Sequence, residues 1–199
     1  MTLINKILRR LIRVHKYMLY KAPCDQLASS TLADRESVVV LDATSLALHA
    51  ETVAALKMLA SDASDYLSDV EAGRVVALVI SVDGQIVHYS YVFVQNKSAC
   101  ILGLDRDTAL IGNAFTAPDY RGKGCQSRSV GLRAAIAKAR GFSFVAAETS
   151  PGNVSSQRGL QKGGMRFVGR LDLLVLLNCL VVRWRRPRGV PVFGVCLHG

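Results

Sequence analysis

Apolar and polar positions along the chain repeat with two periods, one typical of helices and one typical of strands. Over the first 23 residues, apolar side chains recur near helical spacing with lysines and arginines between them, which predicts a basic amphipathic helix over residues 1–23. The polar stretch over residues 24–36 has no periodicity and predicts a linker. Residues 37–186 carry the remaining regular pattern and predict one folded domain.

That domain is predicted to be mixed α/β. Strands are predicted at residues 37–44, 74–81, 85–95, 100–104, 109–116 and 142–148 and from residue 165 onward, and helices at residues 47–72, 124–140 and 154–162. The apolar run over residues 173–182 is about half a membrane span, so we interpret it as buried strand. The order of elements predicts an antiparallel first half and a βαβ-like second half. Residues 187–199, which contain two prolines, predict an irregular tail or a weak edge strand.

The basic N-terminal segment leaves two interpretations open. Its arginines interrupt the apolar run that a secretory signal needs, and the segment is too polar to span a bilayer. One interpretation is a helix packed on the main domain with its basic side in solvent. The other is a helix whose residues 3–21 contact an anionic membrane surface or a partner.

Composition excludes several classes of protein. Half of the 199 residues are apolar and a fifth are charged, which excludes a disordered chain. The five cysteines are an odd number without a C-x-x-C pair, which argues against a disulfide framework and against a zinc site. We therefore expect no metal and a reducing, cytoplasmic location. The basic N-terminal segment suggests a second possibility, peripheral contact with the inner face of the membrane.

The net charge of +10 is distributed unevenly along the chain. Residues 1–23 carry six Lys/Arg and no acid, residues 24–120 carry five Lys/Arg against thirteen Asp/Glu, and residues 121–199 carry fourteen Lys/Arg against two acids. This asymmetry predicts an anionic ligand facing the basic part. Nucleic acid is disfavoured, because the aromatic residues lie mostly on predicted strands and are not interleaved with lysine and arginine.

The segment AFTAPDYRGKGCQSRS, residues 114–129, carries the clearest chemical signal. A predicted strand ends there, Pro118 closes it, and the run Arg121-Gly122-Lys123-Gly124 opens a helix. Glycines allow a sharp turn and a close approach of the backbone to a ligand, while the unpaired N–H groups and the dipole at a helix start favour anions. The segment predicts a phosphate site, and the alternative is an ordinary helix start with solvated basic residues. Neither a P-loop nor a Rossmann glycine motif is present.

This segment resembles the acyl-CoA signature of the GNAT superfamily of N-acyltransferases, [QR]-x-x-G-x-[GA]. Arg121 and Gly124 match its first and fourth positions, whereas Gln126 departs from the sixth. A second element, NVSS at residues 153–156 followed by KGGM at residues 162–165, is similar to the family's N-x-x-[AS]…K-x-G-[FM]. The resemblance implies a mostly antiparallel mixed sheet with two splayed central parallel strands, flanked by helices.

The resemblance also implies acetyl-CoA as the acyl-donor substrate, held in the gap between the splayed strands 109–116 and 142–148. Backbone N–H groups of residues 122–127 would hold the pyrophosphate, and the backbone of residues 115–117 would pair with the pantetheine arm. A backbone N–H near a strand bulge would polarise the thioester carbonyl. The implied donor-binding residues are Phe115, Thr116, Ala117, Arg121, Gly122, Lys123, Gly124, Cys125, Gln126, Ser127, Asn153 and Ser156.

In such enzymes an amine attacks the thioester directly, and the enzyme supplies proximity and a proton acceptor. Glu148, at the end of a cleft-forming strand, is the candidate catalytic base, and the alternative is an ion pair with a nearby arginine. Many relatives carry a tyrosine acid where this chain has Leu160, which we expect in the core. Cys125 has no evident histidine partner and is not expected to be a nucleophile.

Two hypotheses about function follow. The first is transfer of an acetyl group from acetyl-CoA to a primary amine of a small molecule or a surface glycan. The second is a degenerate, non-catalytic GNAT fold that binds CoA or a membrane, and Gln126 and Leu160 motivate it. Because residues 1–23 lie outside the family resemblance, they are expected to be dispensable for acetyl-CoA binding.

Overall fold

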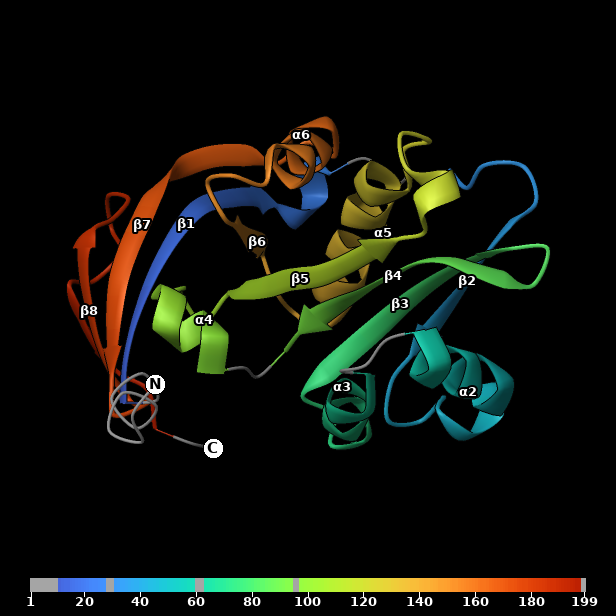
Figure 1. Ribbon diagram of the computed structural model, residues 1–199, viewed down its shortest axis with the longest axis horizontal. Coiled ribbons are helices and arrows are strands. Elements are labelled where there is room, and N and C mark those ends of the chain that lie inside the picture. The colour runs from blue at the N-terminus through green and yellow to red at the C-terminus, as the bar shows by residue number, and fades with distance from the viewer. Residues whose placement is uncertain (1–10, 28–30, 60–62, 95–96, 198–199) are drawn as a thin grey trace, which may run out of the picture.

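The structure is a computed structural model that describes residues 11–27, 31–59, 63–94 and 97–197. Within these residues a single nine-stranded sheet has the order β2-β3-β4-β5-β6-β1-β7-β8-β9 (Figure 1). The strands are β1 Ile12–Pro23, β2 Glu36–Leu41, β3 Val75–Val82, β4 Gln85–Phe93, β5 Thr108–Thr116, β6 Phe144–Thr149, β7 Arg166–Leu176, β8 Leu180–Arg185 and β9 Phe193–Val195. The helices are η1 Cys24–Gln26, η2 Ala47–His49, α2 Ala50–Leu59, α3 Ala63–Glu71, α4 Lys97–Leu102, η3 Pro118–Tyr120, α5 Cys125–Ala139 and α6 Val154–Lys162.

One pair of neighbouring strands, β5 and β6, is parallel, and the other neighbours in the sheet are antiparallel. The parallel pairing covers three positions, from Thr108 opposite Phe144 to Leu110 opposite Ala146. Beyond these positions the two strands diverge and no longer pair with each other (Figure 1). On their other edges, β5 still pairs with β4 and β6 with β1. The predicted fold class, a mixed and mostly antiparallel sheet with splayed central parallel strands, is confirmed.

The N-terminal segment is a strand inside the sheet. Residues 12–23 form β1, which pairs with β6 on one side and with β7 on the other. The predicted helix over residues 1–23 is therefore wrong for residues 12–23, and residues 1–10 lie outside the described part of the chain. Two flanking strands that lie more than a hundred residues away supply the ladder, and such long-range pairing overrides a local helical pattern.

This placement corrects two further expectations. The domain does not begin at residue 37, because β1 is a central strand of its sheet. A membrane-binding helix over residues 3–21 is wrong for residues 12–21, whose backbone is paired on both edges. The predicted linker over residues 24–36 contains η1 and ends at Glu36, the first residue of β2. No helix in the described residues is long and apolar enough to cross a membrane.

Three other predicted elements differ from the structure. The predicted helix over residues 47–72 is divided into η2, α2 and α3, with residues 60–62 outside the description. The predicted strand over residues 100–104 is wrong, because α4 covers most of it, and a short apolar run does not distinguish strand from helix. The predicted strand over residues 173–182 is a β7–β8 hairpin, and Leu177 and Asn178 turn the chain with φ of 49° and 60°. The tail contributes the edge strand β9, one of its two predicted forms.

The cysteines contradict the expectation of a chain without disulfides. Cys100 of α4 and Cys196, directly after β9, form a disulfide, while Cys24, Cys125 and Cys179 are free thiols. The two bridged residues are 96 positions apart in the sequence, so no local spacing indicates the pair. The cysteine count is therefore no guide to the redox compartment of this chain.

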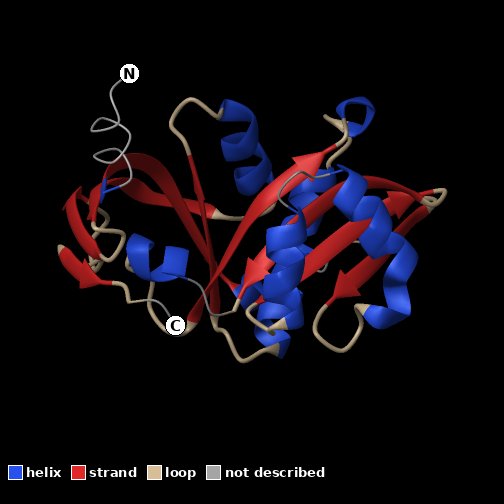
Figure 2. Ribbon diagram, turned by 60° about the horizontal axis from the view of Figure 1, so that its bottom comes forward, coloured by secondary structure: helices blue, strands red, loops and turns tan. Residues whose placement is uncertain are grey.

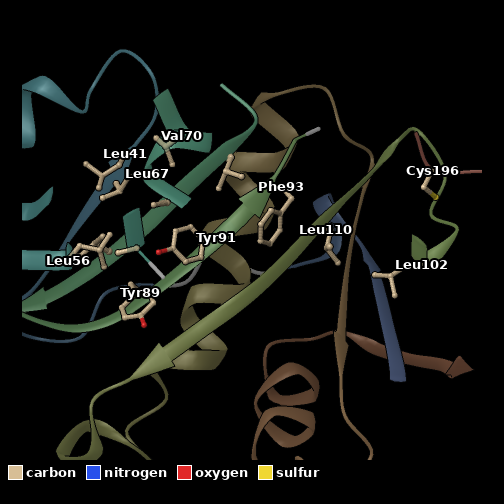
Figure 3. Packing of buried hydrophobic residues seen from close by; sticks show 14 of the residues in the cluster. Leu41, Leu56, Leu67, Val70, Tyr89, Tyr91, Phe93, Leu102, Leu110 and Cys196 are labelled. Carbon is tan, nitrogen blue, oxygen red and sulfur yellow. The ribbon is translucent and has the colours of Figure 1, made fainter. Parts of the chain in front are cut away.

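Each face of the sheet carries its own hydrophobic cluster, and helices lie on both sides (Figure 2). One cluster joins α2, α3 and α4 to the sheet and contains Tyr89, Tyr91 and Phe93, which follow one another along β4 (Figure 3). The other joins α5 and α6 to the opposite face, where Val130 and Leu160 are buried. Helices and hydrophobic side chains thus cover both faces of the sheet.

Candidate donor-binding cleft

The divergence of β5 and β6 opens a cleft of about 740 Å³. Its walls come from the end of β5, the turn that follows, the start of α5, the end of β6 and the first turns of α6. Most of the predicted site residues line it: Phe115, Thr116, Arg121, Gly122, Gly124, Cys125, Gln126, Ser127, Glu148, Asn153 and Ser156. Ala117 and Lys123 do not line this cleft. The structure therefore brings residues from two distant sequence motifs to one cavity.

The glycine turn presents backbone donors at the mouth of the cleft. Gly122 and Gly124 have φ of 78° and 83°, a backbone conformation that residues other than glycine rarely adopt. Gly124 is the N-cap of α5 and no side chain caps this helix end. The first N–H groups of a helix have no partner within it, so those of residues 125–127 are available to an anion. The turn has the features of a phosphate site.

An ion pair holds this turn from outside the cleft. The Nε–H and an Nη2–H of Arg128 donate to the two carboxylate oxygens of Glu36, the first of them at 3.1 Å, and Nη1 donates to the carbonyl oxygen of Lys123 at 2.8 Å. The Glu36 side chain is 4% exposed. The positive charge of Arg128 is therefore paired with Glu36. Sequence reasoning missed Glu36 because 92 residues separate it from its partner.

The other basic residues of the turn also have local partners. The Nε–H of Arg121 donates to the carbonyl oxygen of Thr116 at 3.2 Å, and Nζ of Lys123 lies 4.5 Å from the ring centroid of Tyr120. The N–H of Ala117 donates to the carbonyl oxygen of Val87 at 2.9 Å. That donor belongs to the sheet, so the backbone N–H of Ala117 does not serve a ligand in the cleft.

The second motif shapes α6 and its contact with α5. Oδ1 of Asn153 accepts a hydrogen bond from the N–H of Ser156 at 3.1 Å and caps α6. Gln126 packs against Gly159 so closely that a Cβ at Gly159 would lie 2.5 Å from Cγ of Gln126. The residue that departs from the family signature therefore lies between the two helices, where a glycine makes room for it.

β5 contains a bulge within the cleft wall. Phe115 is opposite Tyr89, but Gly112 is opposite Tyr91, so three steps along β5 match two steps along β4. Asn113, in the bulge, has φ of 48°, and its side-chain amide donates to the hydroxyl of Tyr66 on α3. A bulge leaves one residue outside the ladder, and Asn113 in this bulge lines the cleft.

Glu148 lines the cleft from β6, where it is half-buried. Burial raises the pKa of its carboxyl above the ordinary value. None of the ion pairs among the described residues includes Glu148, so the alternative of a structural pair with arginine is wrong. A carboxylate of this kind is suited to accept a proton near neutral pH.

β1 adds a residue near Glu148, Tyr17, and its partner His15, both of which sequence reasoning missed. Tyr17 lies on the same face of the sheet as Glu148, and its hydroxyl is 3.0 Å from Nδ1 of His15. Burial raises the pKa of Tyr17, and the charge of Glu148 adds to that effect. No signal in the sequence could have found these residues while the segment was assigned to a helix outside the domain.

Leu160 and Cys125 have surroundings that do not suit a catalytic role. Leu160 is buried against α5, as expected for the position that lacks the family's tyrosine. Burial raises the pKa of the Cys125 thiol and outweighs the charge of Arg128, which acts in the opposite direction. A thiol with a raised pKa is a poor nucleophile near neutral pH. Among the described residues, no group of three or more His, Cys, Asp or Glu could hold a metal ion.

Comparisons with known proteins bear on the fold. No protein-family model matches the sequence, and no curated protein matches it. The GNAT-family acetyltransferase of Colwellia psychrerythraea aligns with a TM-score of 0.56 and 14% identity over 88% of this chain and 62% of its own. The GCN5-related N-acetyltransferase-like protein of Streptococcus suis aligns with 0.55 and 14% over 87% and 66%. The aminoglycoside N-acetyltransferase AAC(6')-Iy, described in complex with CoA, aligns with 0.51 and 18% over 65% and 91%.

The chain has the fold of the GNAT N-acetyltransferases. It spans less than two thirds of the length of the Colwellia and Streptococcus proteins. The glycine turn and the splayed strand pair occupy the places that the sequence resemblance implied. At identities of 14–18% these three structures establish the fold alone.

Proposed function

We propose that this protein is an acyl-CoA-dependent N-acyltransferase that transfers an acetyl group from acetyl-CoA to a primary amine. The observation that carries the proposal is the junction of a splayed parallel strand pair with an uncapped helix start. Both features open on the same cleft of about 740 Å³. That the AAC(6')-Iy structure is described in complex with CoA supports the choice of donor.

The residues of the cleft fit the donor substrate. The N–H groups of residues 125–127, with the left-handed glycines before them, would hold the pyrophosphate. The edge of β5 that β6 leaves unpaired, at Phe115 and Thr116, would hold the pantetheine arm. The ion pair of Glu36 with Arg128 supports the turn from behind, so the turn is rigid before the donor arrives.

The chemical step uses Glu148 as the base. The acceptor ammonium loses a proton to the Glu148 carboxylate, and the free amine attacks the thioester carbon. A C–N bond forms, the C–S bond breaks, and the CoA thiolate takes up a proton. Burial holds the pKa of Glu148 above its ordinary value, which makes the carboxylate a stronger base than a solvated one.

The acceptor is proposed as a primary amine of a small molecule or a surface glycan. Residues 24–120 carry thirteen acids against five Lys/Arg, a balance that favours an acceptor that is cationic before it is deprotonated. A cytoplasmic location is part of the proposal, because the cytoplasm is where acyl-CoA thioesters are made and used. No nucleic acid is proposed as a partner.

Release of free thiol from acetyl-CoA across a library of amines tests the activity, with a reaction without acceptor as the control. Thermal melting tests donor binding separately. A ligand at a hundredfold excess over its Kd adds about 2.7 kcal/mol to the free energy of unfolding. A melting shift without turnover on any amine would favour the alternative, a non-catalytic CoA-binding module. No shift at millimolar acetyl-CoA would overturn both.

A further inference from the structure

One face of the sheet is apolar at its outer end, where β1, β7, β8 and β9 are neighbours (Figure 1). Residues directly opposite each other in an antiparallel ladder point to the same face, and so do residues two positions apart on a strand. The register of these strands therefore defines two rows of side chains that cross all four strands. Both rows contain apolar residues only: Ile12, Leu176, Leu180 and Val195, and then Val14, Leu174, Val182 and Phe193. We call these eight residues the outer apolar face.

The outer apolar face is open, whereas the other side of the same strands is packed. Phe193 is 73% exposed and Val14 is 59% exposed, but Val175 and Val181 on the other side are buried. The solvated face of an antiparallel sheet ordinarily carries polar side chains. Here all eight positions are apolar, and Trp184 on β8 is exposed as well. A contiguous exposed apolar patch marks an interaction site.

Basic residues border the outer apolar face. The next row on the same face contains Lys16, Asp172 and Arg185, and Arg170 follows on β7. Asp172 is buried, and its Oδ2 lies 3.7 Å from Nη1 of Arg185. Lys16, Arg170 and Arg185 are exposed. The polar side of this border is therefore positively charged.

The acyl-donor cleft does not account for these cations. Residues 166–188 carry six arginines against one acid. None of the six lines the cleft, whose basic lining residues are Arg121, Arg133, Arg158 and Lys162. Five of the six are exposed: Arg166, Arg170, Arg185, Arg186 and Arg188. The positive charge of the second half of the chain is thus divided between the cleft and the outer end of the sheet, and the second group calls for an anionic partner of its own.

An anionic lipid surface fits this combination better than a second copy of the chain. In a two-fold dimer the outer apolar face would meet itself. The only acid in β1, β7, β8 and β9 is the buried Asp172, so the strands of a second copy would offer no exposed acid to these cations. A lipid surface offers an apolar layer for the exposed side chains and phosphates for the lysine and arginines. Trp184 and Phe193 are aromatic groups of the kind that enter such a surface.

We propose that the outer apolar face and its basic border bind peripherally to a membrane that contains anionic phospholipid. The apolar side chains enter the headgroup region, and the cations contact the lipid phosphates. The strands keep their ladder, so the contact requires neither a helix nor a change of fold. The proposal does not depend on the acyltransferase function, because no residue of the outer apolar face lines the cleft.

Co-sedimentation of the full chain with vesicles tests the proposal. Vesicles of phosphatidylcholine alone are compared with vesicles of phosphatidylcholine mixed with phosphatidylglycerol. We expect binding to the anionic vesicles to be tighter by about tenfold or more, and to weaken as the salt concentration rises. Equal binding to both kinds of vesicle, or binding to neither, would overturn the proposal.

Variants show whether the outer apolar face makes the contact. Trp184→Thr combined with Phe193→Thr removes two exposed aromatic side chains and keeps residues that suit a strand. The affinity for anionic vesicles should fall by about tenfold or more, because burial of one large apolar side chain contributes that much. The acetyl-CoA melting shift should not change. Met58→Gln is the matched control, because it removes an exposed apolar side chain from α2 and should leave vesicle binding unaltered.

A second pair of substitutions tests the basic border. If the aromatic double variant fails to fold, Arg186→Gln with Arg188→Gln should still reduce the affinity several-fold and make it less dependent on salt. Unchanged vesicle affinity in either folded double variant would refute the assignment. Sedimentation velocity of the full chain without vesicles tests the other occupant. A dimer that Trp184→Thr with Phe193→Thr converts to a monomer would assign the outer apolar face to a second copy and overturn the proposal.

Discussion

Leu19 of β1 and Glu148 of β6 are direct partners across an antiparallel ladder. Beyond Leu110 and Ala146, β6 has no pairing with β5, so the N-terminal strand supplies the ladder that holds the outer half of β6. The backbone that positions Glu148 in the cleft wall therefore depends on residues that come first in the chain. This relationship reverses the expectation that the N-terminal segment is an appendage.

A truncation that starts at Asp34 should not fold. It removes a central strand that pairs on both edges, including the buried residues Leu19 and Tyr20. We expect an insoluble product, or one without a cooperative melting transition by circular dichroism. A chain that starts at Leu11 keeps all of β1 and is the matched control, which should retain the acetyl-CoA melting shift. A soluble Asp34 chain that still binds acetyl-CoA would show that β1 is dispensable.

The sequence predicted those parts of the fold and site that rest on local signals. The glycine turn, α5 and α6 each depend on residues within a few positions of one another, and all three were predicted. β1 and Glu36 depend on partners that lie a hundred residues or so away. The pattern of apolar and polar residues in one segment does not indicate which distant segment pairs with it, so β1 and the role of Glu36 were missed.

Replacement of Glu148 by Gln should reduce the rate of the chemical step. The amide keeps the size and reach of the side chain but cannot accept a proton, and general-base assistance is typically worth about 10²–10⁴ in rate. We expect kcat to fall by that range near neutral pH with an unchanged acetyl-CoA melting shift. The loss should shrink at high pH, where the amine arrives already deprotonated. Wild-type kcat across the pH range would exclude Glu148 as the base.

The same variant has a pH-dependent effect on stability. Burial raises the pKa of Glu148 in the folded state above its unfolded value, because the buried site disfavours the charged form. The resulting stabilisation is present below the unfolded pKa and is lost as the pH rises through the folded pKa. Glu148→Gln resembles the protonated form, so its Tm should equal that of wild type near pH 4 and exceed it above pH 7. An equal Tm at both pH values would show that the carboxylate is solvated.

Replacement of Glu36 by Gln should loosen the glycine turn. It weakens a buried ion pair whose arginine also holds the carbonyl of Lys123, and hydrogen bonds to charged groups contribute about 1.5–3 kcal/mol. We expect a lower Tm and a weaker affinity for acetyl-CoA. Asp83→Asn is the matched control, because it weakens a half-exposed pair with Arg35, neither residue of which lines the cleft, and it should change the Tm and the affinity only slightly. Unaltered affinity in Glu36→Gln would separate the ion pair from the donor site.

Replacement of Gly122 by Asp tests the phosphate role of the turn apart from backbone strain. Gly122 and Gly84 have nearly the same φ, 78° and 80°, and a Cβ at either position would meet nothing within 4 Å. Each change to Asp therefore costs a similar amount of stability, about 1 kcal/mol for the left-handed conformation. Gly84 lies in the turn between β3 and β4, whereas Gly122 lines the cleft. Only Gly122→Asp puts a negative charge where the pyrophosphate is proposed, so it should abolish the acetyl-CoA melting shift while Gly84→Asp retains it. The same shift in both variants would mean that the donor is held elsewhere.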